Sequence, residues 1–202
     1  AANLRWEPGH TPSFPAHTPS GSKRAPGLLH LSFRNEKDGI IEDYLFADAP
    51  GEWFNKWATH SEAPEAEGAR WLSIHADIFL LVADRQALSG EQKGRTRAEL
   101  NRLIKRIGST IQNRSIALVW SKSDIKCDEL IEHNIRTNVL GTIPHMVEFE
   151  TQIIRNADAK ESSEKNILTL LKWVLEQKMS ICELPIVSYK GTDPLFMLGQ
   201  ES

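Results

Sequence analysis

Two nearly continuous apolar runs, at residues 78–83 and 115–120, constrain the fold of this chain most strongly. Each has the length of one strand, and neither alternates polar with apolar side chains, as a strand with one face in water does. Between them, residues 96–111 carry apolar side chains at helical spacing. Two buried strands joined by a helix predict a parallel sheet with right-handed crossovers.

The flanking segments extend this pattern. Residues 28–33 and 40–47 are typical of two strands, and the polar residues 35–39 between them predict the turn of a hairpin. Further elements are expected at 55–76 (helix, interrupted near Pro64), 128–135 (helix), 146–154 (strand or helix), 167–175 (helix) and 181–188 (strand). The sequence therefore predicts an α/β fold with a mainly parallel sheet, helices on both faces and one antiparallel hairpin.

The domain organisation follows from length and from the distribution of proline and glycine. The 202 residues suit one domain or slightly more, with a sizeable core. Residues 1–27 are rich in Pro, Gly, Ser and Thr, which indicates a long loop. Residues 28–202 are expected to form the α/β domain, with an insertion at about 127–157.

Composition excludes several function classes. The net charge of -3 does not indicate a basic surface for nucleic acid. No apolar run approaches the roughly 20 residues that a membrane helix needs. The two cysteines have no metal-type spacing, which favours free thiols in a reducing compartment, and no secretory signal is visible. We therefore expect a cytoplasmic protein with no membrane span and no nucleic-acid partner.

Polar clusters follow the expected strands, at residues 48–52, 84–85, 121–124 and 188–190. In open parallel sheets, ligands bind beyond the carboxyl ends of the strands. The convergence of these clusters on one rim of the sheet is the first indication of a binding site.

The cluster at 48–52 suits a phosphate-bound magnesium ion. A carboxylate at Asp48 can hold a water of the metal's shell, because magnesium keeps several waters. Gly51 lets the backbone approach closely, so that its N–H can donate to a terminal phosphate. Taken alone, the segment is better explained as a turn at the end of a strand, since Asp, Pro and Gly all favour turns.

The cluster at 121–124 suits recognition of guanine. The carboxylate of Asp124 can accept hydrogen bonds from the N1 and N2 donors of guanine, and Lys122 can lay its aliphatic stem along the base. Adenine lacks those donors and would leave the carboxylate unpaired, which is costly for a buried charge. The alternative is a solvated polar loop.

Together these segments resemble motifs of the TRAFAC-class P-loop GTPases. The Asp-Ala-Pro-Gly at 48–51 looks like the DxxG motif, and the Ser-Lys-Ser-Asp at 121–124 looks like NKxD with Ser121 in place of Asn. The Ser-Tyr-Lys at 188–190 is similar to the weaker SAK motif. Among subfamilies, the strand followed by Asp-x-Pro-Gly-Glu and aromatic residues is similar to the double-GTPase modules of bacterial conflict systems.

The resemblance implies a Ras-like P-loop NTPase fold that binds GTP or GDP with Mg²⁺ and hydrolyses GTP to GDP. A protein partner or second domain would read the switch regions. The site residues that it implies are Asp48 and Thr18 for the metal (Thr11 being the second choice), Gly51, Ser121, Lys122, Asp124, Ser188 and Lys190 for the nucleotide, and Glu52 for catalysis.

Three assignments stay open at this point. Glu52 could orient the attacking water or be a plain surface carboxylate. Arg85 could approach the site or form a structural salt bridge. Trp53 and Trp57 could form a partner surface, although packing into the core is the preferred interpretation.

A Gly-x-x-x-x-Gly-Lys-Ser/Thr phosphate loop does not occur in the 202 residues. That loop would bind the β- and γ-phosphates through its N–H groups and its lysine. Either this chain is part of a longer GTPase, which we favour, or it is a catalytically inactive GTPase-like interaction module. In the first case the resemblance implies that the missing strand lies between those at 40–47 and 78–83, and the 202-residue chain alone is expected to be poorly soluble.

Overall fold

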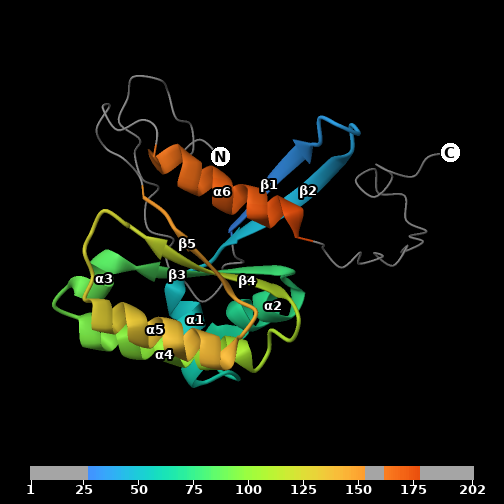
Figure 1. Cartoon of the computed structure of the whole chain (residues 1–202). Helices are drawn as coiled ribbons and strands as arrows, with labels where there is room; N and C mark the ends of the chain where they lie inside the picture. Colours follow the sequence, from blue (N-terminus) through green and yellow to red (C-terminus); the bar gives the residue numbers. More distant parts are fainter. Residues whose placement is uncertain (1–26, 153–161, 178–202) are drawn as a thin grey trace.

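Two separate β-sheets organise the protein in a computed structural model that describes residues 27–152 and 162–177. In the first sheet, β1 (Gly27–Arg34) and β2 (Ile41–Asp48) pair as an antiparallel hairpin. In the second, β3 (Ile78–Asp84), β4 (Ser115–Ser121) and β5 (Val147–Glu150) run parallel in that order. Figure 1 shows the hairpin beside the parallel sheet.

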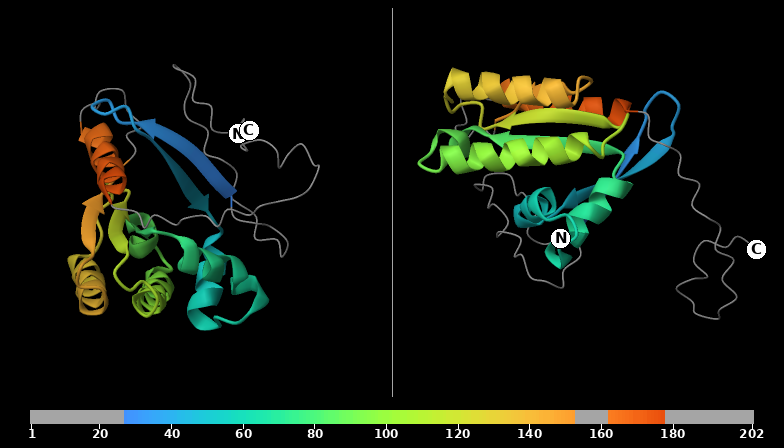
Figure 2. Two further views of the ribbon diagram at one scale, coloured as in Figure 1. Left: turned by 90° about the vertical axis from the view of Figure 1, so that its right-hand side faces the viewer. Right: turned by 90° about the horizontal axis from the view of Figure 1, so that it is seen from below.

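Helices cover both faces of the parallel sheet (Figures 1 and 2). On one face, α4 and α5 lie side by side, and α6 lies on the other face, next to the hairpin. The described helices are α1 (Gly51–Thr59), the 3-10 turn η2 (Pro64–Ala66), α2 (Glu67–His75), α3 (Arg85–Ser89), α4 (Lys93–Gly108), α5 (Glu129–Thr142) and α6 (Ser162–Glu176). This arrangement confirms the predicted α/β fold with one antiparallel hairpin.

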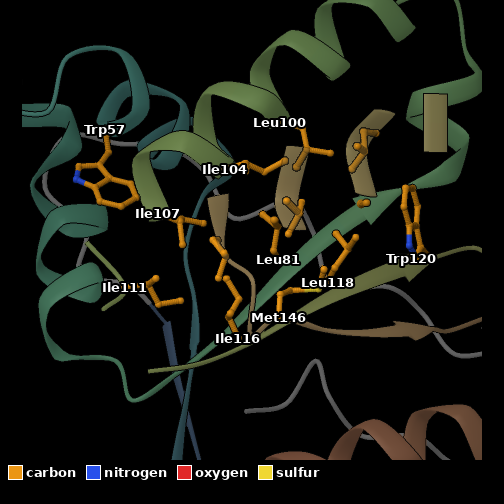
Figure 3. Packing of buried hydrophobic residues seen from close by; sticks show 14 of the residues in the cluster. Trp57, Leu81, Leu100, Ile104, Ile107, Ile111, Ile116, Leu118, Trp120 and Met146 are labelled. Carbon is orange, nitrogen blue, oxygen red and sulfur yellow. The ribbon is translucent and has the colours of Figure 1, made fainter. Parts of the chain in front are cut away.

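The core lies between the parallel sheet and the α4 side of the molecule. All five interior residues of β4 are buried, as the continuous apolar run predicts. Leu118 and Trp120 of β4 belong to the same buried cluster as Leu100 and Ile104 of α4 (Figure 3). The apolar face of α4 and the apolar strand β4 thus contribute to one packed core.

The hairpin is tied to the rest of the molecule through Tyr44. Its ring is buried and packs edge-on against Phe33 at a centroid distance of 5.6 Å. Its hydroxyl lies 3.0 Å from a carboxylate oxygen of Glu42 and 3.3 Å from the carbonyl oxygen of Leu175 on α6, and it can donate to either. In the parallel sheet, Phe149 of β5 contacts Trp173 of the same helix α6 at a ring-centroid distance of 5.6 Å.

Several boundaries differ from the predictions. The first helix begins at Gly51 rather than at residue 55, because the turn at Pro50 leads directly into it. The helix expected at 128–135 continues to Thr142, since Ile135 and Val139 extend its buried stripe. The ambiguous segment 146–154 contains a strand, β5.

Other predicted segments are placed in part or not at all by the structure. Both α5 and β5 fall within the expected insertion at 127–157, where β5 extends the parallel sheet and α5 covers one of its faces. The expected strand at 181–188 and the loop at 1–27 lie outside the described residues, apart from Gly27 at the start of β1.

Candidate functional site

The carboxyl ends of the three parallel strands form one rim. In the register of the sheet, Asp84 at the end of β3 is opposite Ser121 at the end of β4. Glu150 at the end of β5 is opposite Trp120. The polar segments at the ends of these three strands are therefore neighbours in space. They are residues 84–86, 121–124 and 151–152.

Lys122 is held at this rim by the junction of β3 and α3, which follow each other directly. Its ammonium Nζ lies 2.7 Å from Oδ2 of Asp84 and 2.7 Å from Oε1 of Gln86. The other oxygen of Asp84 accepts hydrogen bonds from the backbone N–H groups of Gln86 and Ala87, which caps the short helix α3. The backbone of Lys122 is left-handed, with φ of 55°. The chain therefore turns sharply as it leaves β4, and the lysine stem lies along the rim.

The segment after Lys122 is fixed through its backbone. The N–H of Ser123 donates to the carbonyl of Thr151 at 3.0 Å, and the hydroxyl of Ser123 donates to Oε1 of Gln152 at 3.1 Å. The N–H of Ile125 donates to the carbonyl of Lys122 at 2.9 Å and closes a tight turn. Asp124 lies within this turn and is exposed. Its carboxylate is therefore presented to solvent by a constrained backbone.

Arg85 is buried beneath this turn and forms an ion-pair network. Its Nη1 donates to the carbonyl of Ser123 at 3.2 Å. Its Nη2 lies 2.7 Å from Oε1 of Glu150, and its Nε lies 2.8 Å from Oε1 of Glu132. Burial lowers the pKa of Arg85, but the hydrogen bonds and charges of the two glutamates outweigh burial and raise it. Of the two roles left open, the structure supports the structural salt bridge.

The turn that follows β2 carries the second predicted cluster. Asp48, Gly51 and Glu52 are exposed, whereas Pro50 is buried. A Cβ added at Gly51 would meet no atom within 4 Å, so packing does not require glycine there, and space is open beside its backbone. This turn joins the same core as the parallel sheet, because Ala49 packs against the buried cluster.

Trp53 and Trp57 of α1 are buried in the core, with 8% and 3% of their surfaces exposed. The preferred interpretation of these two residues as core residues is confirmed.

Sequence reasoning missed one contributor to the rim, residues 151–152 after β5. The sequence left the type of this element open, because a four-residue strand is too short for its periodicity to separate strand from helix. The expected third cluster, with Ser188 and Lys190, lies outside the described residues, as does Thr18. These three assignments remain predictions, as do the roles of Asp48 and Asp124 in one shared site.

The described part of the chain lacks two further features. Among residues 27–152 and 162–177, no group of three or more His, Cys, Asp or Glu side chains is arranged to hold a metal ion. None of the helices in these ranges has the length and apolar character needed to span a lipid bilayer.

Comparison with known proteins gives one family. The model of a family described as Double-GTPase 2 matches residues 1–174, which is most of the chain. The match includes the turns at 48–51 and 121–124 and the segment 151–152, and it ends before residue 188. A comparison with curated proteins gives no match.

Proposed function

Because this chain belongs to the Double-GTPase 2 family, we propose that it is a guanine-nucleotide-binding switch domain that hydrolyses GTP to GDP with magnesium. The observation that carries the proposal is the turn at residues 121–124. It stands at the carboxyl ends of the parallel strands, with Lys122 held along the rim and Asp124 presented to solvent.

The base would be recognised by Asp124 and Lys122. The exposed carboxylate of Asp124 accepts hydrogen bonds from N1 and N2 of guanine, while the lysine stem packs along the ring and its ammonium stays anchored on Asp84. Ser121 occupies the position next to Lys122 where related motifs carry Asn. Adenine presents no matching donors. A bound adenine would therefore leave the carboxylate of Asp124 without hydrogen-bond partners, and the site selects guanine.

The third segment of the base site is assigned to residues 151–152 in this proposal. The carbonyl of Thr151 and the side chain of Gln152 already contact Ser123, and the family match covers them. Ser188 and Lys190 fall beyond the matched residues. Their predicted role at the base is therefore the weaker assignment.

The phosphates would lie at the turn after β2. The exposed carboxylate of Asp48 suits a hard cation such as Mg²⁺, which prefers oxygen ligands, and Thr18 is the second proposed ligand. The ion, when bound, neutralises charge on the phosphate oxygens. Gly51 donates its backbone N–H to the terminal phosphate. Glu52, exposed in the first turn of α1, orients the attacking water.

A phosphate loop is the remaining requirement, and the 202 residues contain no motif for one. Among the described strands, β2 pairs only with β1, and β3 pairs only with β4, so each has one edge without a strand partner. We place the strand that carries the phosphate loop between these two edges, which joins the two sheets into one.

Substitution of Asp124 by Ala in the natural full-length protein tests this proposal. We expect the preference for GDP over ADP, measured as the ratio of dissociation constants, to be lost, because the two hydrogen bonds that distinguish the bases are removed. Asp77→Ala is the matched control, since Asp77 is an exposed aspartate before the start of β3, at the opposite end of the sheet. An unchanged preference in Asp124→Ala would refute the assignment.

An inactive interaction module is the second candidate, and the absence of a phosphate-loop motif from the 202 residues favours it. It predicts no heat of GTP binding in calorimetry of the full-length protein. Guanine-dependent binding heat decides in favour of the switch domain.

A further inference from the structure

The buried side chain of Arg85 holds the peptide group that joins Ser123 to Asp124. Its carbonyl oxygen accepts a hydrogen bond from Nη1 of Arg85 at 3.2 Å. The nitrogen of the same peptide group belongs to Asp124, so its orientation sets the direction in which the backbone enters Asp124. Arg85 is only 7% exposed, whereas Asp124 is on the surface. The buried side chain of Arg85 thus fixes the backbone that leads into the exposed residue Asp124.

Three other contacts prevent the guanidinium of Arg85 from moving. Glu132 of α5 and Glu150 of β5 form ion pairs with it at 2.8 and 2.7 Å. Its Cζ lies 5.6 Å from the ring centroid of Trp120, which is fully buried. A planar guanidinium with several donors can satisfy two carboxylates and a carbonyl at once, which an ammonium group cannot do in the same geometry. The anchor of the turn is therefore specific to arginine.

We propose that Arg85 is a positioning residue for guanine recognition, which fixes the peptide group before Asp124 and thereby aims the carboxylate at the base. The proposal rests on the proposed function and deepens it, because it assigns part of the selectivity to a residue that does not contact the nucleotide. Removal of the Arg85 contact leaves Asp124 in place but lets its carboxylate turn.

A misdirected carboxylate should affect selectivity more than affinity. Asp124 distinguishes guanine from hypoxanthine through one hydrogen bond, to the 2-amino group that hypoxanthine lacks. Hydrogen bonds to charged groups are sensitive to direction and are stronger than neutral ones. Contacts to the ring face and the phosphates do not depend on this direction. The ratio of dissociation constants for IDP and GDP therefore reports how well the carboxylate is aimed.

Arg136 provides a matched control within the same cluster. It stacks on the same indole, with its Cζ 5.0 Å from the Trp120 ring centroid, and it also pairs with Glu132, at 3.1 Å. A further ion pair joins it to Glu148 at 2.7 Å. Its ion pairs with Glu132, Glu148 and Glu150 lie within the cluster and do not reach residues 121–124. Substitution of Arg136 disturbs the network and the packing without removing the contact to Ser123.

The experiment compares Arg85→Lys with Arg136→Lys in the natural full-length protein, with GDP and IDP as probes. We expect Arg85→Lys to lower the IDP/GDP ratio of dissociation constants about tenfold, which is the scale of one hydrogen bond to a charged group. Arg136→Lys should leave the ratio unchanged. Thermal unfolding without nucleotide shows that both variants are folded. If Arg85→Lys does not fold, Glu150→Gln replaces it, because the ion pair of Glu150 with Arg85, at 2.7 Å, is much shorter than its pair with Arg136, at 4.0 Å, and a smaller decrease in the ratio is expected.

The possible results distinguish a failure of the positioning role of Arg85 from a failure of the guanine site. An unchanged ratio in folded Arg85→Lys, or an equal change in both variants, overturns the positioning role and leaves the guanine site intact. A wild-type protein that binds GDP and IDP equally overturns the guanine site and the positioning role together.

Discussion

At the scale of single residues, the turn at 121–124 is built from two anchors of different strength. The ion pair between Lys122 and Asp84 is partly exposed, with 46% and 36% of the two side chains accessible. Exposed pairs of this kind contribute at most about 1 kcal/mol. Arg85 is buried and paired with two carboxylates, and removal of one member of such a network is strongly destabilising. The lysine is thus held loosely and the peptide group before Asp124 tightly.

Asp84→Asn should lower the affinity for guanine nucleotides without changing base selectivity. The variant keeps a side-chain oxygen to cap α3 but removes the charge that anchors Lys122, so the stem packs less well along the base. We expect the dissociation constants for GDP and IDP to rise by the same factor, about two- to fivefold, the scale of an exposed ion pair.

Fluorescence titration of both nucleotides measures this effect, with Asp77→Asn as the control at the opposite end of β3. A selective loss for GDP in Asp84→Asn would mean that Asp84 acts on Asp124 rather than on Lys122. No loss for either nucleotide would mean that Lys122 does not touch the base.

The individual site residues divide clearly into those that the sequence could reveal and those that it could not. Lys122 and Asp124 follow a long buried strand, so their place on the rim could be predicted. The partners of Lys122 and Ser123 could not be predicted, because Gln86 of α3 and Gln152 after β5 come from distant parts of the chain, and nothing in the local pattern marks a glutamine as such a partner. The role of Arg85 required knowledge of which glutamates surround it.

At the scale of elements, the hydroxyl of Tyr44 links the hairpin to α6. Tyr44 is 6% exposed and lies within hydrogen-bond distance of the carbonyl of Leu175. Burial, and then the neighbouring carboxylate of Glu42, raise the pKa of the Tyr44 phenol. Both causes disfavour the phenolate in the folded state.

Stability should therefore decrease at high pH through Tyr44. An unfolded tyrosine ionises near pH 10. Because the folded pKa is raised, the stabilisation is fully present below the unfolded pKa and is lost as the pH rises from there through the folded pKa. We expect the free energy of unfolding of the wild type to decrease above about pH 10 more steeply than that of Tyr44→Phe.

Chemical denaturation of both proteins between pH 8 and 11, a range chosen to bracket the unfolded pKa of about 10, measures the difference. Glu42→Gln should retain most of the effect, since burial is its larger cause. Parallel curves for the wild type and Tyr44→Phe would show that the hydroxyl ionises equally in both states.

Elements were predictable where their periodicity was long. The run at 115–120 and the stripe of α4 gave the correct types because each covers a full strand or several helical turns. The extent of α5 was underestimated, because Thr137, Asn138 and Gly141 are weak helix formers and tertiary burial of Val139 outweighs them. The type of β5 depends on its pairing with β4, which is a long-range contact.

At the scale of the whole molecule, strand pairing within the described residues does not join the two sheets. Within the described residues, β2 and β3 each hydrogen-bond to a strand on one side only. On β3, Leu80 is 39% and Val82 is 56% exposed, although they belong to an apolar strand of the type that is normally covered. An unpaired strand edge next to exposed apolar side chains favours pairing with another chain.

We therefore expect the 202-residue chain alone to aggregate. Addition of a strand–loop–helix segment that carries the proposed phosphate loop should give a monomer with a single cooperative unfolding transition, measured by size-exclusion chromatography and thermal denaturation. A flexible Gly-Ser segment of equal length is the control and should not help. A soluble monomer of the 202 residues that unfolds cooperatively would contradict the proposed central strand.

The carboxylate of Asp84 uses one oxygen to cap α3 and the other to hold Lys122. Departure of the lysine therefore leaves the cap intact, and α3 does not fray when the rim rearranges. Ser123, in contrast, stays fastened to the interior through Arg85. The turn is thus fixed by an exposed ion pair at Lys122 and by a buried contact at Ser123, so that its Lys122 side is the more easily released.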